Sequence, residues 1–179
     1  GLPASWIAMS KRSLKSLTAM YSSNRMVHDY VEAAYRPAAG RRDELAANDW
    51  ELCRELAVWR EDLAVRFGTL KLEEIILSGA DGNTMFCGEP VNVRLRLTPG
   101  EMKPEEILVQ LVIGRTFANG NFRDKPDVLR LEPRSNGNGI TYSATYIPRR
   151  NGAYRYGIRV MPVHKGLSSP LETGLVLWG

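Results

Sequence analysis

The chain has 179 residues, of which 44% are hydrophobic and 25% are charged. These proportions are close to those of globular proteins and exclude collagen-like, disordered and disulfide-rich chains. The net charge of +4 comes from 24 basic and 20 acidic residues, which are interleaved along the sequence without a basic block. Nucleic-acid binding normally needs Lys and Arg concentrated on one face, so we expect no nucleic-acid partner.

Neither the cysteines nor the apolar runs indicate a metal centre or a membrane span. Cys53 and Cys87 form no Cys-x-x-Cys pair, so we expect two reduced thiols. The longest apolar runs, such as 108–113, are much shorter than the roughly 18 residues of a transmembrane helix. No signal peptide is visible at the N-terminus. The expectation is a cytoplasmic protein without a membrane partner.

Apolar residues recur at helical spacing over residues 6–35, and the polar triplet 22–24 interrupts them. The pattern predicts a first helix that ends near Met20 and a second that begins near Arg25, because short polar side chains cap free amides. Pro37 and Gly40 are predicted to end the second helix, since proline lacks a donor and disfavours a helical residue before it.

A third helix is predicted from Asn48 to Gly68. Asn48 and Glu51 form an approximate capping box at its start, and Gly68 suits the left-handed residue that closes a helix. Its polar face carries acidic and basic side chains, whereas its opposite face is apolar at three- and four-residue steps. That apolar stripe, in which we interpret Trp59 as a core residue, consists of Leu52, Leu56, Trp59, Leu63 and Phe67.

After Gly68 the apolar period changes from about 3.6 to 2. Alternating strands are predicted at 91–98, 140–146 and 154–160, and less regular ones near 72–77, 107–113, 128–131 and 171–178. Seven short strands separated by turns are typical of an immunoglobulin-like sandwich. The predicted fold class is therefore α+β, with N-terminal helices over 1–70 followed by an immunoglobulin-like antiparallel β-sandwich over 71–179.

Tyr154 supports the sandwich interpretation. Residues 151–156, NGAYRY, are similar to the corner that enters the sixth strand of many such sandwiches. In that corner a tyrosine hydroxyl bonds to upstream backbone. We assign this structural role to Tyr154.

No motif for catalysis is present. The sequence lacks a Gly-x-Ser-x-Gly elbow, a Walker lysine, a His-Glu-x-x-His pair and a Gly-x-Gly-x-x-Gly loop after a strand. His28 and His164 have no partners that spacing alone supplies, and we interpret them as surface or loop histidines. The stretch 136–139 indicates a hairpin turn and not a phosphate-binding loop, because a phosphate-binding loop needs to be followed by a helix. We predict no catalytic residue, metal ligand or cofactor-binding residue in this chain.

Exposed aromatic rings could stack on sugars. Most aromatic residues of the chain lie on predicted core stripes. Phe117 and Phe122 instead flank the turn at 119–121, and they are our candidates for carbohydrate binding.

Segments along nearly the whole chain resemble the glycogen and α-glucan phosphorylases, most closely their shorter prokaryotic branch. Trp6, Ile7 and Met9, followed by SSNRMV (22–27), DYVE (29–32) and YRPA (35–38), resemble the closing segment of the second Rossmann-like half of that two-domain glycosyltransferase. MKPEEILV (102–109), YGIRVMPVH (156–164) and ETGLVLW (172–178) resemble the extra C-terminal region of the same branch.

The resemblance implies that residues 1–70 are the end of a glycosyltransferase domain with a connecting helix, and that 71–179 are an accessory domain. It gives Arg25 and Tyr30 structural roles. Phosphorylases use pyridoxal phosphate on a lysine upstream of this region, and no lysine here lies in a segment that resembles that site. The cofactor and the catalytic centre would belong to the remainder of the polypeptide, which is the implied partner, with α-glucan as a further ligand.

Two functions stay open at this stage. The first is a C-terminal piece of an α-glucan phosphorylase, which transfers glucosyl units between α-1,4-glucan and phosphate, with a structural, assembly or glucan-contacting role. The alternative is a stand-alone carbohydrate-binding or protein-interaction module. The first predicts apolar surface on Trp6, Met9, Leu14 and Leu17, and with it self-association or partner binding.

Overall fold

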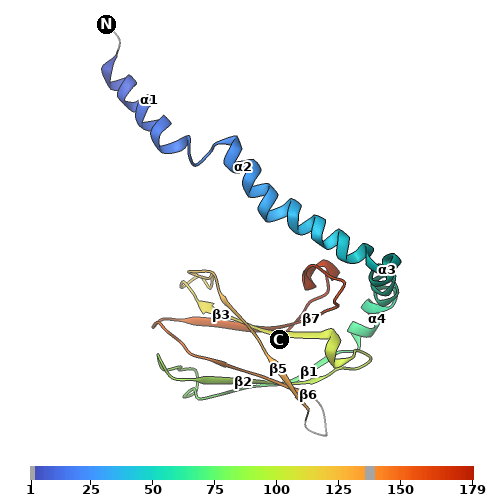
Figure 1. The fold of residues 1–179 in the computed structure, drawn as a ribbon. Helices are drawn as coiled ribbons and strands as arrows, with labels where there is room; N and C mark the ends of the chain where they lie inside the picture. The colour runs from blue at the N-terminus through green and yellow to red at the C-terminus, as the bar shows by residue number, and fades with distance from the viewer. Residues whose placement is uncertain (1–2, 136–139) are drawn as a thin grey trace. The chain divides into compact units, whose positions relative to one another are not determined.

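The computed structural model describes residues 3–135 and 140–179, so the turn predicted at 136–139 lies outside the described residues. Packing divides the chain into two compact units, residues 1–54 and 55–179, here called the N-terminal and the C-terminal unit. The N-terminal unit is helical, and the C-terminal unit combines short helical segments with two β-sheets (Figure 1). The coarse class is therefore α+β, as predicted.

The N-terminal unit begins with α1 (Ala4–Leu17) and α2 (Ser23–Tyr30). The Ser22 side chain accepts a hydrogen bond of 3.2 Å from the Arg25 backbone N–H and so caps α2, in agreement with the predicted role of the polar triplet. The first helix ends three residues earlier than predicted and the second begins two residues earlier.

The prediction that Pro37 and Gly40 end the second helix is wrong. A π-helical segment, η1 (Val31–Tyr35), follows α2 directly and leads into α3 (Arg36–Glu61). In a regular α-helix the proline ring clashes with the carbonyl four residues earlier. The Arg36 N–H bonds to the carbonyl of Val31, five residues back, so the turn is wider just before Pro37 and accommodates its ring.

The helix α3 is interrupted at residues 47–50. Ala47 is extended, with ψ of 151°, and Asn48, Asp49 and Trp50 have φ values of 51°, 54° and 63°. The predicted capping box is therefore wrong, because an N-cap residue has extended backbone and Asn48 is left-handed. After glycine, Asn and Asp tolerate left-handed backbone best, whereas it costs a residue such as Trp50 about 1–2 kcal/mol.

The rest of α3 and the short α4 (Leu63–Gly68) carry the predicted apolar stripe. Trp59, Leu63 and Phe67 are buried in the core of the C-terminal unit, and Leu56 packs against it. Gly68 is the last residue of α4 and lacks a positive φ, so its predicted left-handed role is wrong. Thr69 closes the helix in right-handed conformation, and its hydroxyl donates to the Arg66 carbonyl at 2.7 Å.

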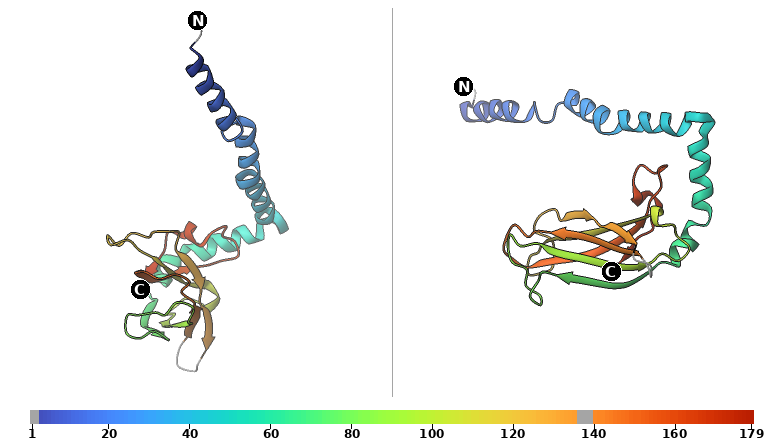
Figure 2. Two further views of the ribbon diagram at one scale, coloured as in Figure 1. Left: turned by 90° about the vertical axis from the view of Figure 1, so that its left-hand side faces the viewer. Right: turned by 60° about the horizontal axis from the view of Figure 1, so that its bottom comes forward.

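In residues 3–135 and 140–179, eight strands form two four-stranded antiparallel sheets (Figures 1 and 2). One sheet has the order β1-β2-β6-β5 and the other β4-β3-β7-β8. Short 3₁₀ segments precede β3 (η2, Pro104–Glu106) and β8 (η3, Pro170–Thr173). The strands are β1 (Lys71–Ser78), β2 (Val91–Thr98), β3 (Ile107–Arg115), β4 (Asp127–Arg130), β5 (Glu132–Ser135), β6 (Ile140–Tyr146), β7 (Tyr154–Pro162) and β8 (Leu177–Trp178).

The two sheets share one core. Along β2, buried and exposed residues alternate as the sequence predicted, and Leu95 and Leu97 are fully buried. From the other sheet, Leu111 of β3 and Ile158 of β7 are fully buried in the same cluster. Burying each of these side chains contributes about 1.5–3 kcal/mol, so this core stabilises the C-terminal unit.

The C-terminal part of the chain departs from the predicted strands in two places. The strand predicted over 171–178 is mostly wrong, because Ser169 caps η3 and only Leu177–Trp178 pair with β7. The prediction also missed β5, which follows β4 after the single residue Leu131 but pairs in the opposite sheet. Leu131 is 1% exposed and donates its N–H to the Val109 carbonyl at 2.9 Å, so it anchors the crossing.

Tyr154 makes the hydrogen bond that the sequence predicted for it. Its hydroxyl donates to the carbonyl of Arg150 at 2.8 Å. Its ring meets the Tyr146 ring edge-on, with the ring centroids 6.3 Å apart. This bond fixes the path of the chain between β6 and β7.

Candidate functional site

The N-terminal unit presents apolar side chains to solvent. Trp6 and Leu17 lie three turns apart on α1, and Ile7 and Leu14 lie two turns apart, whereas Lys11, Arg12 and Lys15 occupy the other side. We call Trp6, Met9, Leu14 and Leu17 the α1 apolar face. They are 61%, 62%, 66% and 47% exposed, so the predicted apolar surface is present. None of the described residues 3–54 is buried.

Arg25 and Tyr30, which the resemblance made structural, are both exposed in α2. Besides its backbone bond to Ser22, Arg25 makes only a 3.7 Å ion pair with the exposed Asp29 among the described residues. The Tyr30 ring is 54% exposed. Neither side chain packs against the described part of the chain, so a structural role for them needs a further surface.

Trp59 holds residues 55–61 of α3 to the sheets of the C-terminal unit. Its indole N–H donates to one Glu106 oxygen at 2.8 Å, and Arg66 donates to the other at 2.9 Å. The Lys103 backbone N–H adds a bond of 3.1 Å. Burial by itself raises the pKa of Glu106, but these three hydrogen bonds outweigh it and the pKa lies below its usual value.

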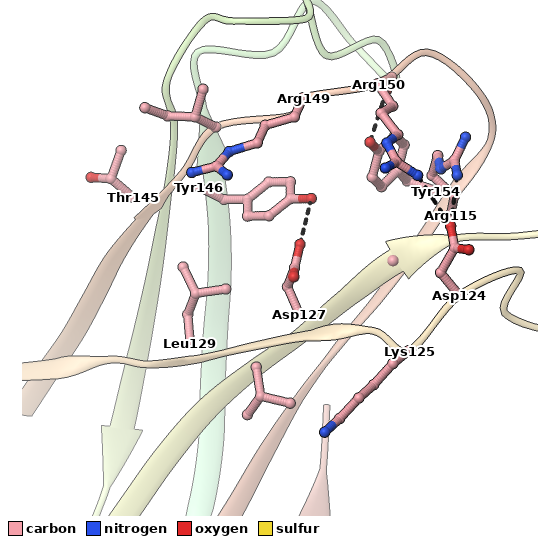
Figure 3. A pocket seen from close by; sticks show the side chains of 13 residues that line it. Arg115, Asp124, Lys125, Asp127, Leu129, Thr145, Tyr146, Arg149, Arg150 and Tyr154 are labelled. Atoms are coloured by element: carbon pink, nitrogen blue, oxygen red, sulfur yellow. Dashed lines mark hydrogen bonds and ion pairs between the residues drawn. The ribbon is translucent and has the colours of Figure 1, made fainter.

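A pocket of about 800 Å³ lies where β3, β4, β6 and β7 meet (Figure 3). The end of β3 and the loop after it line one side, and the end of β6 with residues 149–150 lines the other. The labelled lining residues are Arg115, Asp124, Lys125, Asp127, Leu129, Thr145, Tyr146, Arg149, Arg150 and Tyr154. Both sheets contribute to it, and the β6–β7 corner with its Tyr154 bond positions two of its arginines.

Two carboxylates organise the pocket. Tyr146 donates its hydroxyl to Asp127 at 3.2 Å, and Arg115 contacts Asp124 at 2.6 Å. Burial, with smaller contributions from Tyr154 and Asp127, raises the pKa of Tyr146 and keeps the phenol protonated as a donor. The Arg115 hydrogen bond lowers the pKa of Asp124. The pocket thus offers fixed charges and no activated nucleophile.

Phe117 and Phe122 lie on the β3–β4 loop with rings 49% and 37% exposed. The turn between them closes through a bond of 2.9 Å from the Phe117 N–H to the Asn121 carbonyl. The guanidinium of Arg123 lies 4.9 Å from the centroid of the Phe117 ring. A Cβ added at Gly114 would lie 3.0 Å from the Phe122 ring, so this ring packs on the β3 backbone and Phe117 is the freer platform.

The remaining candidates lead to no reactive centre. His164 follows β7 and stacks on Trp59 with ring centroids 5.0 Å apart, and His28 is exposed on α2. Cys53 and Cys87 are exposed free thiols. Within residues 3–135 and 140–179 there is no metal-binding group of three His, Cys, Asp or Glu side chains. None of the helices in that part of the chain has the length and apolar character needed to cross a membrane.

Sequence reasoning missed the pocket. Its lining comes from residues 114–129 and 145–154, which only the pairing of β3 with β7 and the two-sheet packing bring together. The available signal was the pair Arg149-Arg150 next to the predicted tyrosine corner, because two adjacent cations beside a fixed turn can serve one anion.

Comparison with known proteins shows the family of the chain. Residues 68–179, which include β1 to β8, match the family described as the glycogen phosphorylase C-terminal domain. The chain therefore belongs to that family, and the resemblance stated from the sequence is confirmed.

Curated relatives match the chain beyond that domain. Glycogen phosphorylase of Mycobacterium tuberculosis (strain ATCC 25618 / H37Rv) is 28% identical over 179 residues, covering 98% of this chain and 20% of the relative. Maltodextrin phosphorylase of Thermococcus litoralis is 29% identical over 180 residues, with the same coverage of 98% and 20%. The chain thus spans about a fifth of the length of the curated relatives it matches.

Proposed function

We propose that this chain is the C-terminal part of an α-glucan phosphorylase, an enzyme that transfers glucosyl units between α-1,4-glucan and phosphate. In this proposal residues 1–70 are the end of the glycosyltransferase domain with its connecting helix. Residues 71–179 are an accessory domain of immunoglobulin-like type with a structural or assembly role. The two exposed thiols support a cytoplasmic setting for it.

The lack of any buried residue among the described residues 3–54 carries the proposal. Helices acquire most of their stability by burying an apolar face, and ordering each residue costs roughly 1–2 kcal/mol in backbone entropy. Helices with no buried side chain therefore need a partner surface. The relatives are about five times longer than the chain, so the remainder of such a polypeptide is the partner that we propose for the α1 apolar face. In its absence the same face favours self-association.

Pyridoxal phosphate, which the family resemblance implies for the parent enzyme, does not fit the residues of this chain. Its attachment needs a lysine in an enclosed site, and all six lysines here are exposed. Lys165, for example, contacts Glu55 at 2.7 Å. We therefore assign the cofactor, the catalytic residues and the glucan subsites of the reaction to the remainder of the polypeptide.

A second role is supported by the loop of Phe117 and Phe122. An exposed turn that carries two aromatic rings can contact a sugar, because the apolar faces of sugars stack on such rings. The accessory domain would then contact α-glucan, and the same property would serve a stand-alone carbohydrate-binding module.

Fragment complementation tests the main proposal. The polypeptide that precedes this chain in its gene is produced separately, and co-purification with the chain and phosphorolysis of maltodextrin are measured. We expect neither fragment alone to release glucose 1-phosphate and the mixture to form a complex. The variant Trp6→Gln/Met9→Gln/Leu17→Gln should lose the complex.

The matched control changes the other side of the same helix, in Lys11→Gln/Arg12→Gln/Lys15→Gln, and should keep the complex. Phosphorolysis by the chain alone would contradict the proposal. So would a complex that the apolar variant leaves intact.

A further inference from the structure

The sheet β4-β3-β7-β8 has an outer face on the side opposite the shared core, with β3 and β7 in its middle (Figure 1). Each of its strands packs one aliphatic side chain in that core: Leu129, Leu111, Ile158 and Leu177. Side chains alternate between the two faces of a sheet, so the strand neighbours of these residues point outward. Their pairing forms an outward row that crosses the whole sheet, with the members Arg130, Gln110, Arg159 and Trp178.

The next row of this outer face is apolar. Val128 pairs with Val112, which in turn pairs with Gly157. The Trp178 ring lies over that glycine, at 3.5 Å from the position of an added Cβ. Val128 and Trp178 are 45% and 57% exposed. The middle of the outer face therefore presents apolar side chains to solvent.

Arginines flank the apolar row on both sides. Arg130 and Arg159 lie in the row on one side of it and Arg155 in the row on the other. The Arg159 Nε donates to the Gln110 side chain at 2.8 Å, which orients its guanidinium. Among the described residues Arg155 takes part in no ion pair, and Arg130 makes only a 3.8 Å contact with the exposed Glu132. No outward position of these four strands is acidic, so three arginines give the face a formal charge of +3.

The outer face of the sheet β1-β2-β6-β5 has a different character. Its arginine Arg96 is neutralised by Glu73 and Glu74 at 2.7 and 3.6 Å. The outward residues of its inner strand β6 are all hydroxylated: Thr141, Ser143 and Thr145. Protein interfaces are enriched in aromatic residues and Arg and depleted in Glu and Ser. Composition therefore distinguishes the outer face of β4-β3-β7-β8, and not that of the other sheet, as a contact surface.

Charge restricts the partner of this face. Two copies of the face would bring two surfaces of charge +3 together and repel each other. The N-terminal unit carries 8 basic and 6 acidic residues, so it offers no acidic surplus. The chain spans 20% of its relatives, which leaves four fifths of such a polypeptide to supply a complementary surface.

We propose that the outer face of β4-β3-β7-β8 docks on the part of the polypeptide that precedes this chain, at a surface with carboxylates around an apolar centre. This inference rests on the proposed function and adds the surface by which the accessory domain is attached. The carboxylates pair with Arg130, Arg155 and Arg159, and the apolar centre packs on Val128 and Trp178.

The size of the face sets its share of the contact. Four strands about 4.8 Å apart, with about six residues of about 3.4 Å each, cover about 400 Å². A stable complex buries roughly 800 Å² on each partner, so the face supplies about half of the area needed. We assign the other half to the α1 apolar face, and we expect changes on the sheet to weaken the complex without abolishing it.

Biolayer interferometry measures the affinity of the 179-residue chain for the preceding fragment that the complementation test uses. Trp178→Ala should weaken binding by about tenfold or more, because a buried tryptophan is a frequent centre of binding energy. Arg130→Glu/Arg155→Glu should also weaken it by about tenfold, since each change replaces an attraction by a repulsion. Salt should weaken the binding of the wild type, and this dependence should be lost in the arginine variant.

Matched controls change the outer face of the other sheet. Ile76→Ala removes a side chain of β1 that is 45% exposed, and Arg94→Glu/Arg134→Glu reverses two charges on β2 and β5. Neither should alter the affinity. Thermal unfolding shows whether each variant is folded, and the arginine variant tests the face without disturbing the packing of Trp178 on Gly157.

Three outcomes contradict the inference. If the wild-type chain binds the fragment and both variants of the face bind it equally well, the inference is overturned and the proposed function stands. If the wild-type chain does not bind the fragment at all, both are overturned. Self-association of the chain that Trp178→Ala abolishes would assign the face to a second copy and overturn the inference alone.

Discussion

At the scale of single residues, Glu106 joins the helical segment 55–68 to the sheets. Its carboxylate accepts from Trp59, Arg66 and the Lys103 backbone, and its own carbonyl accepts from the Val163 N–H at 2.8 Å. Hydrogen bonds to a charged group are worth more than neutral ones, and losing one leaves buried donors unsatisfied. Through its side chain and its backbone, Glu106 therefore links α3, α4 and the residue after β7 to its own 3₁₀ segment, η2.

Replacing Glu106 should lower stability in a way that depends on pH. A depressed folded pKa means that the ionised carboxylate stabilises the fold fully above its unfolded value of 4.5 and less as the pH falls through the lower folded value. We expect Glu106→Gln to lower the free energy of unfolding by about 1–3 kcal/mol at pH 7. The difference from wild type should shrink as the pH falls below that window.

Urea unfolding at a series of pH values measures this difference. Glu105→Gln is the matched control, since Glu105 is an exposed neighbour on the same 3₁₀ segment and should leave the stability unchanged. An equal loss at pH 7 from both substitutions, or a loss from Glu106→Gln that does not change with pH, would contradict the assigned role.

The structural role of a residue could be predicted where that role depends only on the neighbouring sequence. The Tyr154 hydroxyl bond spans four residues, and its corner sequence indicated it. Asn48 and Gly68 were assigned equally local roles, but the break in α3 and the closure by Thr69 depend on how the flanking segments pack. A cap motif alone does not contain that information.

At the scale of elements, the apolar periodicity located strands well. Local sequence signals located the ends of helices and strands less well. The alternation in β2 follows from one face lying in the core, so the sequence alone located it. The crossing at Leu131 divides a short extended run between two sheets, and nothing in its sequence distinguishes it from one strand. Similarly, Pro37 did not end its helix because a wider turn forms before it.

The β3–β4 loop has a testable role of its own. If its rings contact α-glucan, Phe117→Ala should reduce the retention of the chain on a starch gel severalfold, since stacking of a ring contributes about 1 kcal/mol. Phe122→Ala should reduce retention less, because that ring packs on the backbone of Gly114. Affinity electrophoresis with and without starch measures both.

Phe86→Ala serves as the control for that experiment. Phe86 is 50% exposed and lies on the β1–β2 loop, so its loss removes similar apolar surface at another place. Equal retention of wild type, Phe117→Ala and Phe86→Ala would exclude a glucan contact through this loop and leave the accessory domain with its structural role.

At the scale of the whole molecule, the two units differ in what they need to be stable. The C-terminal unit has a core shared by both sheets, whereas the described residues 3–54 have none. The family resemblance predicted the exposed α1 apolar face, because a C-terminal piece of a longer enzyme lacks the neighbours of its first helices. It did not predict the pocket of Figure 3, because long-range strand pairing brings the walls of that pocket together.

The most direct test of the central claim is the size of the native gene product. An antibody raised against this chain is used to probe a lysate of the cells that produce it. Because the chain has a mass of 20.1 kDa and spans 20% of its relatives, we expect a band of about 100 kDa, the mass divided by 0.20. A band at 20.1 kDa would contradict the phosphorylase proposal and favour a stand-alone binding module.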